Sequence, residues 1–79
     1  MDHTRLYVGD LAASVTAQEL SDLFGQIGKV KAVDLISRPP QPPFAFIEMD
    51  TVRRAITQYN GYRLAGLRLI VYSAPPRTR

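Results

Sequence analysis

The sequence has no cysteine, no tryptophan and a single histidine. Without cysteine, neither a disulfide framework nor a thiolate metal site is available. No apolar run approaches the roughly 20 residues of a membrane-spanning helix, and the opening residues Met-Asp-His-Thr-Arg lack the apolar segment of a signal peptide. We therefore expect a soluble, intracellular protein with no membrane partner.

Side chains suited to catalysis are also scarce. His3 lies in a polar stretch with no other metal ligand nearby in sequence, so we assign it neither a catalytic nor a metal-binding role. Glu48 and Asp50 are the closest acidic pair, but they lie at a predicted strand end, where Asp50 is placed to cap the following helix. We expect no enzymatic activity, no metal and no cofactor.

Length and charge set broad limits. A chain of 79 residues forms one domain with one core. Ten Lys and Arg residues against seven Asp and Glu residues give a net charge of +3. This balance is compatible with a polyanionic partner without identifying one.

The segment Pro42–Met49 divides its side chains into two sets, because successive side chains of a strand point to opposite faces. One face carries small and aliphatic residues, namely Ala45, Ile47 and Met49. The other face carries Phe44, Phe46 and Glu48. Two phenylalanines on an open face expose apolar area that a soluble domain avoids unless something stacks there. This face is the candidate binding surface.

A second strand candidate, Leu6–Leu11, repeats the arrangement. Leu6 and Val8 share one face, and Tyr7 lies on the other. If the two strands are neighbours, the ring of Tyr7 joins those of Phe44 and Phe46 on one surface.

Two amphipathic helices are predicted. The first begins at a capping box, Thr16–Glu19, in which both side chains bond to early backbone N–H groups. Gly25 and Gly28 mark its end, where glycine most easily adopts a left-handed conformation. Its apolar stripe comprises Leu20, Leu23, Phe24 and Ile27.

The second helix follows Asp50 and ends at Asn60-Gly61, with Arg53 and Arg54 on its outer face. Its apolar stripe comprises Val52, Ala55, Ile56 and Tyr59.

Two further strands are expected. Val30–Ile36 is rich in β-branched residues, and its alternation slips once, which predicts a bulge. Lys29 and Lys31 at its start are solvated side chains or contacts to a phosphate backbone. Leu64–Gly66 should be a short extended connection. In the last strand, Leu67–Ser73, the core residues should be Leu67, Leu69 and Val71, opposite Arg68, Ile70 and Tyr72.

The order strand, helix, strand, strand, helix, strand is the split βαβ pattern. It predicts an α+β fold, a ferredoxin-like βαββαβ sandwich in which two helices pack on one face of a four-stranded antiparallel sheet. The other face stays open. We expect a flexible N-terminus over residues 1–4, the domain over 5–74 and a basic C-terminal tail over 75–79.

The connection over residues 37–43 contains four prolines and should be stiff. Pro39–Pro42 satisfies the bare PxxP spacing of SH3 and WW ligands, but neither flank supplies a well-placed basic residue. We favour a rigid loop between two strands.

The two ring-bearing segments resemble the RNA recognition motif family. Its first-strand hexamer is similar to Leu6–Leu11, and its third-strand octamer is similar to Pro42–Met49. Pro42 and Pro43 depart from the octamer, where a basic residue and a glycine are expected, which affects one phosphate contact. The stacking positions are intact, since the matching residues are Phe44, Ala45, Phe46 and Ile47.

The resemblance covers roughly residues 5–74 and is greatest to the first such domain of serine/arginine-rich splicing factors. Those domains combine Pro-Pro-Phe-Ala-Phe with a later Asn/Asp-Gly-Tyr, which is Asn60-Gly61-Tyr62 here. The resemblance implies pre-mRNA splicing or mRNA processing, with other splicing or mRNA-processing proteins as partners. It also implies a monomer in the nucleus that shuttles to the cytoplasm.

What the resemblance implies for the site is single-stranded RNA across the sheet, with Tyr7 and Phe46 stacking on bases and Phe44 packing against riboses. Exposed rings offer a π-face to any base, worth ~1–3 kcal/mol per stacked base.

Polar side chains around the rings complete the candidate site. Glu48 either accepts hydrogen bonds from base amino groups or forms an ordinary strand-end salt bridge. Tyr72 is equally suited to stacking and to covering the sheet edge. Positive charge for phosphates is expected from Arg5, Arg38, Arg68, Arg77 and Arg79.

Two other interpretations remain open at this point. The rings of Tyr7, Phe44 and Phe46 would form a second small core if a helix or the C-terminal tail covered them. The same fold would also serve as a protein–protein interaction module, using the helix face or the sheet aromatics, because a fold does not fix a function. The dependence of affinity on salt distinguishes the two functions, since RNA binding weakens steeply with ionic strength and binding through an apolar interface does not.

Overall fold

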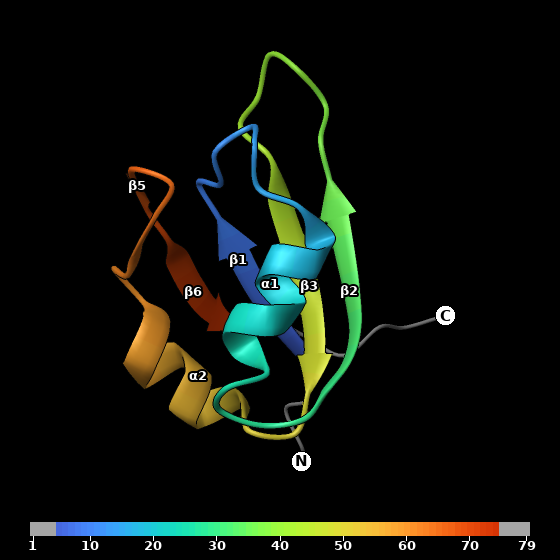
Figure 1. The fold of residues 1–79 in the computed structure, drawn as a ribbon, viewed down its shortest axis with the longest axis vertical. Helices are drawn as coiled ribbons and strands as arrows, with labels where there is room; N and C mark the ends of the chain where they lie inside the picture. Colours follow the sequence, from blue (N-terminus) through green and yellow to red (C-terminus); the bar gives the residue numbers. More distant parts are fainter. Residues whose placement is uncertain (1–4, 75–79) are drawn as a thin grey trace.

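The computed structural model describes residues 5–74, which form two helices packed on an antiparallel sheet. The elements in chain order are β1 (Arg5–Gly9), α1 (Ala17–Phe24), β2 (Val30–Ile36), β3 (Phe44–Met49), α2 (Val52–Tyr59), β4 (Arg63–Leu64), β5 (Leu67–Arg68) and β6 (Ile70–Ser73). The main sheet has the strand order β2-β3-β1-β6, and β4 with β5 forms a separate hairpin. Both helices lie in front of the sheet in Figure 1, which confirms the predicted ferredoxin-like sandwich.

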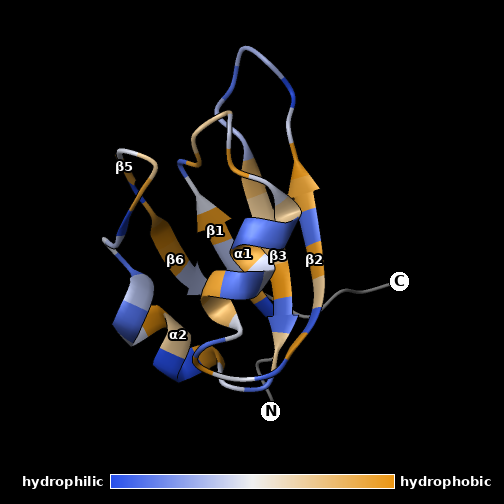
Figure 2. Ribbon diagram, in the orientation of Figure 1, coloured by the Kyte–Doolittle hydropathy of each residue, from blue (hydrophilic) through white to orange (hydrophobic). Residues whose placement is uncertain are grey.

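The core lies between the helices and one face of the sheet. Leu6 and Val8 of β1 are fully buried there, as are the three β3 residues predicted for this face, Ala45, Ile47 and Met49. The helices contribute Leu20, Phe24, Val52, Ala55 and Tyr59. Around each helix in Figure 2, hydrophobic and hydrophilic colours alternate, as expected when only one stripe meets the sheet. Burying each large apolar side chain contributes about 1.5–3 kcal/mol.

Tyr59 joins the two helices. Its hydroxyl donates to the Leu23 backbone oxygen at 2.8 Å. Its ring packs edge-on against Phe24 of α1, with centroids 4.8 Å apart.

No helix within residues 5–74 is long and apolar enough to cross a membrane.

The strand register places residues of like kind on the same face. Tyr7 is directly opposite Phe46 of β3 on one side and Tyr72 of β6 on the other. Phe46 is in turn opposite Asp34 of β2. Asp34, Phe46, Tyr7 and Tyr72 therefore form one row across all four strands on the face away from the helices. The predicted bulge in β2 is confirmed as a register shift between Val30 and Ala32.

The capping box of α1 is confirmed. The Glu19 N–H donates to Thr16 Oγ1 at 3.1 Å, and the Thr16 N–H donates to Glu19 Oε1 at 2.9 Å. The left-handed ending was wrong, because Gly25 is right-handed helical with φ −64°. Gly28 is needed for another reason, since a Cβ there would overlap the side chain of Thr51.

Asp50 does not cap α2, contrary to the prediction. The N-cap is Thr51, whose side chain makes no capping hydrogen bond. Asp50 instead joins the ends of two strands, accepting a hydrogen bond from the Lys29 N–H at 3.0 Å through Oδ1. The Asp50 N–H donates to the Lys29 backbone oxygen at 3.3 Å. The carboxylate therefore serves the tertiary connection between β2 and β3.

The last strand is interrupted, which corrects the expectation of one strand over Leu67–Ser73. Residues 64–66 are not an extended connection: Leu64 ends β4, and Ala65 and Gly66 form the turn of the β4–β5 hairpin, with φ values of 53° and 88°. Two successive left-handed residues are typical of a two-residue hairpin turn. Leu67 lies in this hairpin and is 44% exposed, so its assignment to the core was wrong. Leu69 and Val71 are buried as expected.

Candidate nucleic-acid interface

Four aromatic rings gather on the face of the sheet away from the helices, and Tyr7 lies at their centre. Tyr72 stacks on Tyr7 with centroids 4.8 Å apart and planes at 23°. Phe44 stacks on its other side at 5.7 Å and 28°. Phe46 meets Tyr7 edge-on at 5.8 Å. The three strands β3, β1 and β6 thus bring together the predicted aromatic residues in one continuous surface.

The rings are not covered by any element within residues 5–74. Both helices are on the opposite face, and Tyr72 is 52% exposed while the other three rings are half-buried against each other. Tyr72 therefore stacks on Tyr7 within the cluster, and its role towards a base stays a prediction. Covering by the C-terminal tail concerns residues 75–79, which lie outside the described part of the chain.

Gly9 makes room for the Tyr7 ring. A Cβ at Gly9 would lie 2.7 Å from Cε2 of Tyr7 and 2.8 Å from its hydroxyl oxygen. These distances are too short for carbon, so the ring rests directly over the glycine backbone. The glycine of the β1 segment thereby sets the tilt of the central ring.

Burial raises the pKa of the Tyr7 hydroxyl above its ordinary value of 10.0, and the neighbouring Tyr72 and Asp10 raise that pKa further. The hydroxyl therefore stays protonated throughout the physiological range. A neutral ring does not repel phosphate, and its hydroxyl is available as a donor.

Arg5 lies over Phe46. The guanidinium carbon is 4.2 Å from the ring centroid, a cation–π arrangement. Arg5 is thus brought into the cluster, as predicted, but it occupies the ring face on which a base would stack.

A pocket opens beside Phe46, at the side of the cluster towards β2. It is lined by Arg5, Ala32, Asp34, Phe46 and Glu48. Glu48 is opposite Arg5 on one neighbouring strand and Ala32 on the other. Within residues 5–74, no hydrogen bond or ion pair engages the Glu48 carboxylate, so the strand-end salt bridge is not observed there.

Sequence reasoning did not single out Asp34. The signal was present, because Asp34 stands between Val33 and Leu35 and alternation turns it to the other face. Its place beside Phe46 required the β2–β3 register, which the bulge made unpredictable.

Two of the remaining predicted cations, Arg38 and Arg68, lie outside the strands of the four-stranded sheet. Arg38 is exposed in the loop between β2 and β3, at the top of Figure 1. Arg68 is exposed in the β4–β5 hairpin, opposite Arg63, and so is not part of the four-stranded sheet. Arg77 and Arg79 lie outside the described residues. In the part of the chain from 5 to 74, no three His, Cys, Asp or Glu side chains converge as a metal site would require.

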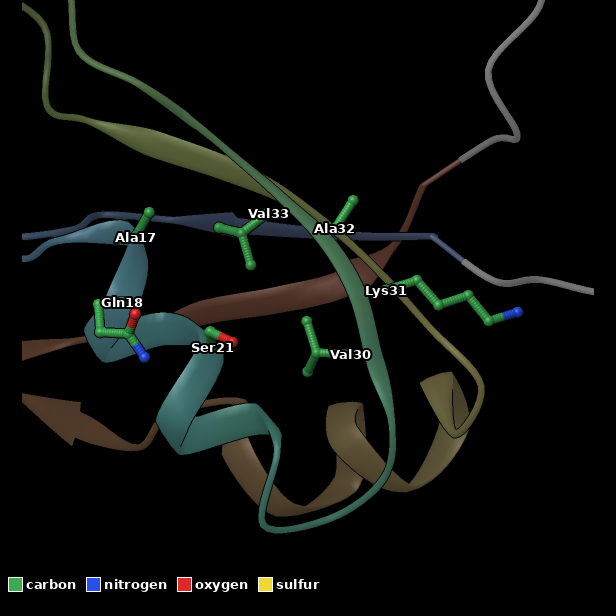
Figure 3. A pocket seen from close by; sticks show the side chains of 7 residues that line it. All are labelled: Ala17, Gln18, Ser21, Val30, Lys31, Ala32 and Val33. Atoms are coloured by element: carbon green, nitrogen blue, oxygen red, sulfur yellow. The ribbon is translucent and has the colours of Figure 1, made fainter.

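A second pocket lies on the helix side, between α1 and the edge strand β2 (Figure 3). Val30 and Val33 point from β2 towards α1, whereas Lys31 extends away from it. Gln18 and Ser21 of α1 complete its polar side. This pocket is separate from the rings and offers a place for a contact through the helix face.

A model of the RNA recognition motif matches residues 6–70. A probable splicing factor of Caenorhabditis elegans, arginine/serine-rich 6, is 39% identical over 67 residues, which is 81% of this chain and 36% of that protein. Human serine/arginine-rich splicing factor 9 is 37% identical over 70 residues, which is 85% of this chain and 32% of that protein. The chain thus spans about a third of the length of these relatives.

A solved structure with the same architecture contains RNA. It is the solution structure of Plasmodium falciparum SR1-RRM1 in complex with ACAUCA RNA, at 29% identity and a TM-score of 0.66. The superposition covers 89% of this chain and 82% of that one.

Proposed function

The chain belongs to the RNA recognition motif family, and from this premise we propose that it binds short single-stranded RNA, without catalysis, on the open face of its sheet. The observation that carries the proposal is the four-ring cluster centred on Tyr7, which no described element covers. Stacking on such rings contributes ~1–3 kcal/mol per base. The RNA held by the similar SR1-RRM1 domain supports the same use here.

Tyr7 and Phe46 act as the stacking platforms in this proposal, and Phe44 packs against a ribose. Arg5 must leave the Phe46 ring when a base arrives there. An exposed cation–π contact is worth about 0.5–1 kcal/mol, less than the ~1–3 kcal/mol of a stacked base. A stacked base thus outweighs the cation–π contact that it replaces, and we assign the displaced guanidinium to a phosphate.

Charge around the cluster supports a polyanionic ligand. The side chains assigned to phosphates are Arg5, Arg38, Arg68 and Arg77. The net charge of +3 is modest, so affinity rests chiefly on stacking, with the arginines adding salt dependence.

The biological process is pre-mRNA splicing or mRNA processing, which the splicing-factor relatives support. A nuclear location, with shuttling to the cytoplasm, follows from that process. The domain acts as a monomer that recruits other splicing or mRNA-processing proteins.

A second candidate function is protein binding through the helix face, favoured by the pocket between α1 and β2. The two candidates use opposite faces of the sheet, so residue-resolved measurements separate them. Binding of protein at this pocket leaves the four rings unchanged.

The test is an amide-shift titration with a pool of short random-sequence RNAs at low and moderate salt. Shifts centred on Tyr7, Phe44 and Phe46 that fade as salt rises are expected. An absence of shifts up to millimolar RNA would overturn the proposal. Shifts confined to Gln18, Ser21 and Val33 would overturn it too, because they would place the ligand on the helix face.

A further inference from the structure

We propose that the pocket beside Phe46 takes a base with an exocyclic amino group, and that Glu48 accepts a hydrogen bond from that group. The inference rests on the proposed RNA binding and adds the identity of the base. It favours adenine, cytosine or guanine over uracil at this position.

Phe46 and Glu48 follow one another on the same face of β3, and both line the pocket. Ala32, directly opposite Glu48 on β2, contributes only a methyl group and leaves space at the edge of the ring. A base stacked on Phe46 would therefore turn one polar edge towards Glu48.

Stacking on an aromatic ring tolerates every base, so selection at this position must come from hydrogen bonds. An ionised carboxylate only accepts hydrogen bonds. Adenine, cytosine and guanine each carry an amino group that donates, whereas uracil has carbonyl oxygens in the corresponding places. A carbonyl against a carboxylate leaves two acceptors facing each other.

The pocket holds the carboxylates of Asp34 and Glu48 and the guanidinium of Arg5. Two negative groups and one positive group disfavour a phosphate inside the pocket, so the ligand group that enters is a base edge rather than the backbone. Phosphates are left to the arginines outside it, and to Arg5 once a base has displaced it from Phe46.

The carboxylates of Glu19 and Glu48 differ in their hydrogen bonding within residues 5–74. Glu19 is engaged with the Thr16 N–H in the capping box of α1. Within residues 5–74, Glu48 has no such partner, so a base breaks no intramolecular bond of this side chain when it arrives. The half-buried carboxylate of Glu48, next to the ring of Phe46, can therefore accept a hydrogen bond from a stacked base.

The experiment compares short oligouridines that differ in one central nucleotide, measured by fluorescence anisotropy with the whole chain. Cytidine should bind about tenfold more tightly than uridine at that position. An oligomer with guanosine at that position should likewise bind more tightly than one with inosine, which lacks only the amino group. The Glu48→Gln variant should bring the cytidine-to-uridine ratio close to one, because its amide donates to a uracil oxygen as readily as it accepts.

Two further variants support the comparison. Asp22→Asn makes the same carboxylate-to-amide change on α1, where the side chain is exposed and accepts a hydrogen bond from Gln18, and should leave the ratio unchanged. Glu48→Ala removes the acceptor without adding a donor and should also reduce the ratio, which covers the case in which Glu48→Gln does not fold.

Equal binding of cytidine and uridine oligomers by the unmodified chain would overturn the inference while leaving RNA binding in place. An unchanged ratio in folded Glu48→Gln and Glu48→Ala would assign the selectivity to another residue and overturn it as well. No binding of any oligomer would overturn the proposed function itself.

Discussion

Tyr72 stacks on Tyr7 across the β1–β6 pairing, with ring centroids 4.8 Å apart and planes at 23°. The contact extends the ring cluster over a third strand and supports Tyr7 from the side opposite Phe44. Such aromatic pairs are worth about 0.5–1.5 kcal/mol beyond the area they bury. Tyr72 thus contributes both to the fold and to the proposed platform.

The Phe46→Leu variant should bind single-stranded RNA about tenfold less tightly, since a leucine offers no π-face to a stacked base. Fluorescence anisotropy measures the loss. The control is Tyr62→Leu, because Tyr62 is exposed but packs edge-on against Tyr59, on the helix side. Equal losses in both variants would contradict a platform at Phe46.

Gly9→Ala should weaken RNA binding with little loss of stability. The new Cβ would force the Tyr7 ring aside, and the end of a side chain can swing while the backbone stays. Thermal unfolding and RNA affinity, measured on the same sample, separate these effects. Unchanged affinity would show that the tilt of the Tyr7 ring does not matter.

Arg38→Gln should make RNA binding less dependent on salt, lowering the slope of log affinity against log salt by about 0.7, the value for one phosphate contact on a single strand. The matched control, Arg54→Gln, changes an exposed arginine of α2 in the helix layer and should leave the slope as it is. A parallel fall in both slopes would indicate general attraction rather than a contact from the β2–β3 loop.

Ala65→Asn should stabilise the domain by about 0.5–1 kcal/mol. Ala65 has φ 53°, which costs an L-residue with a Cβ, whereas Asn followed by Gly suits this turn. Urea unfolding gives the change in free energy. Ala65→Val, with a β-branched side chain in the same conformation, should destabilise the domain. A gain in stability in this variant would contradict a cost of the positive φ at residue 65.

Alkaline pH should destabilise the fold through Tyr7 and Tyr59. Burial raises the pKa of both hydroxyls above 10.0 in the folded chain. Above that pH the unfolded chain binds fewer protons than the folded chain, so the free energy of unfolding falls as pH rises. Below pH 10 this contribution is fully present. Unfolding free energies measured from pH 8 to 11, with Tyr7→Phe as a reference that lacks one of the two groups, test the dependence.

Local patterns in the sequence determined most of the elements. Alternation in Phe44–Met49 separated core residues from exposed rings, and the helical spacing around Phe24 and Tyr59 placed both helices against the sheet. The capping box at Thr16 was predicted because its partners are three residues apart. In each case the physical cause acts between neighbours in the chain.

Tertiary contacts decided what the sequence left open or suggested wrongly. Asp50 had the form of a helix cap, yet it bonds to Lys29, 21 residues away. Ala65 carries no turn signal of its own, so the hairpin that removes Leu67 from the core was not predictable from local preference.

By itself, the sequence determined which faces of the strands and helices are apolar, and that rings remain on the open side of the sheet. Only the tertiary structure decided their neighbours: Tyr72 against Tyr7, Arg5 over Phe46, and Asp34 beside Glu48 in one pocket. The physical reason is strand register. Alternation fixes the face of a side chain, but which residues meet across strands depends on pairing over long separations and on the bulge in β2.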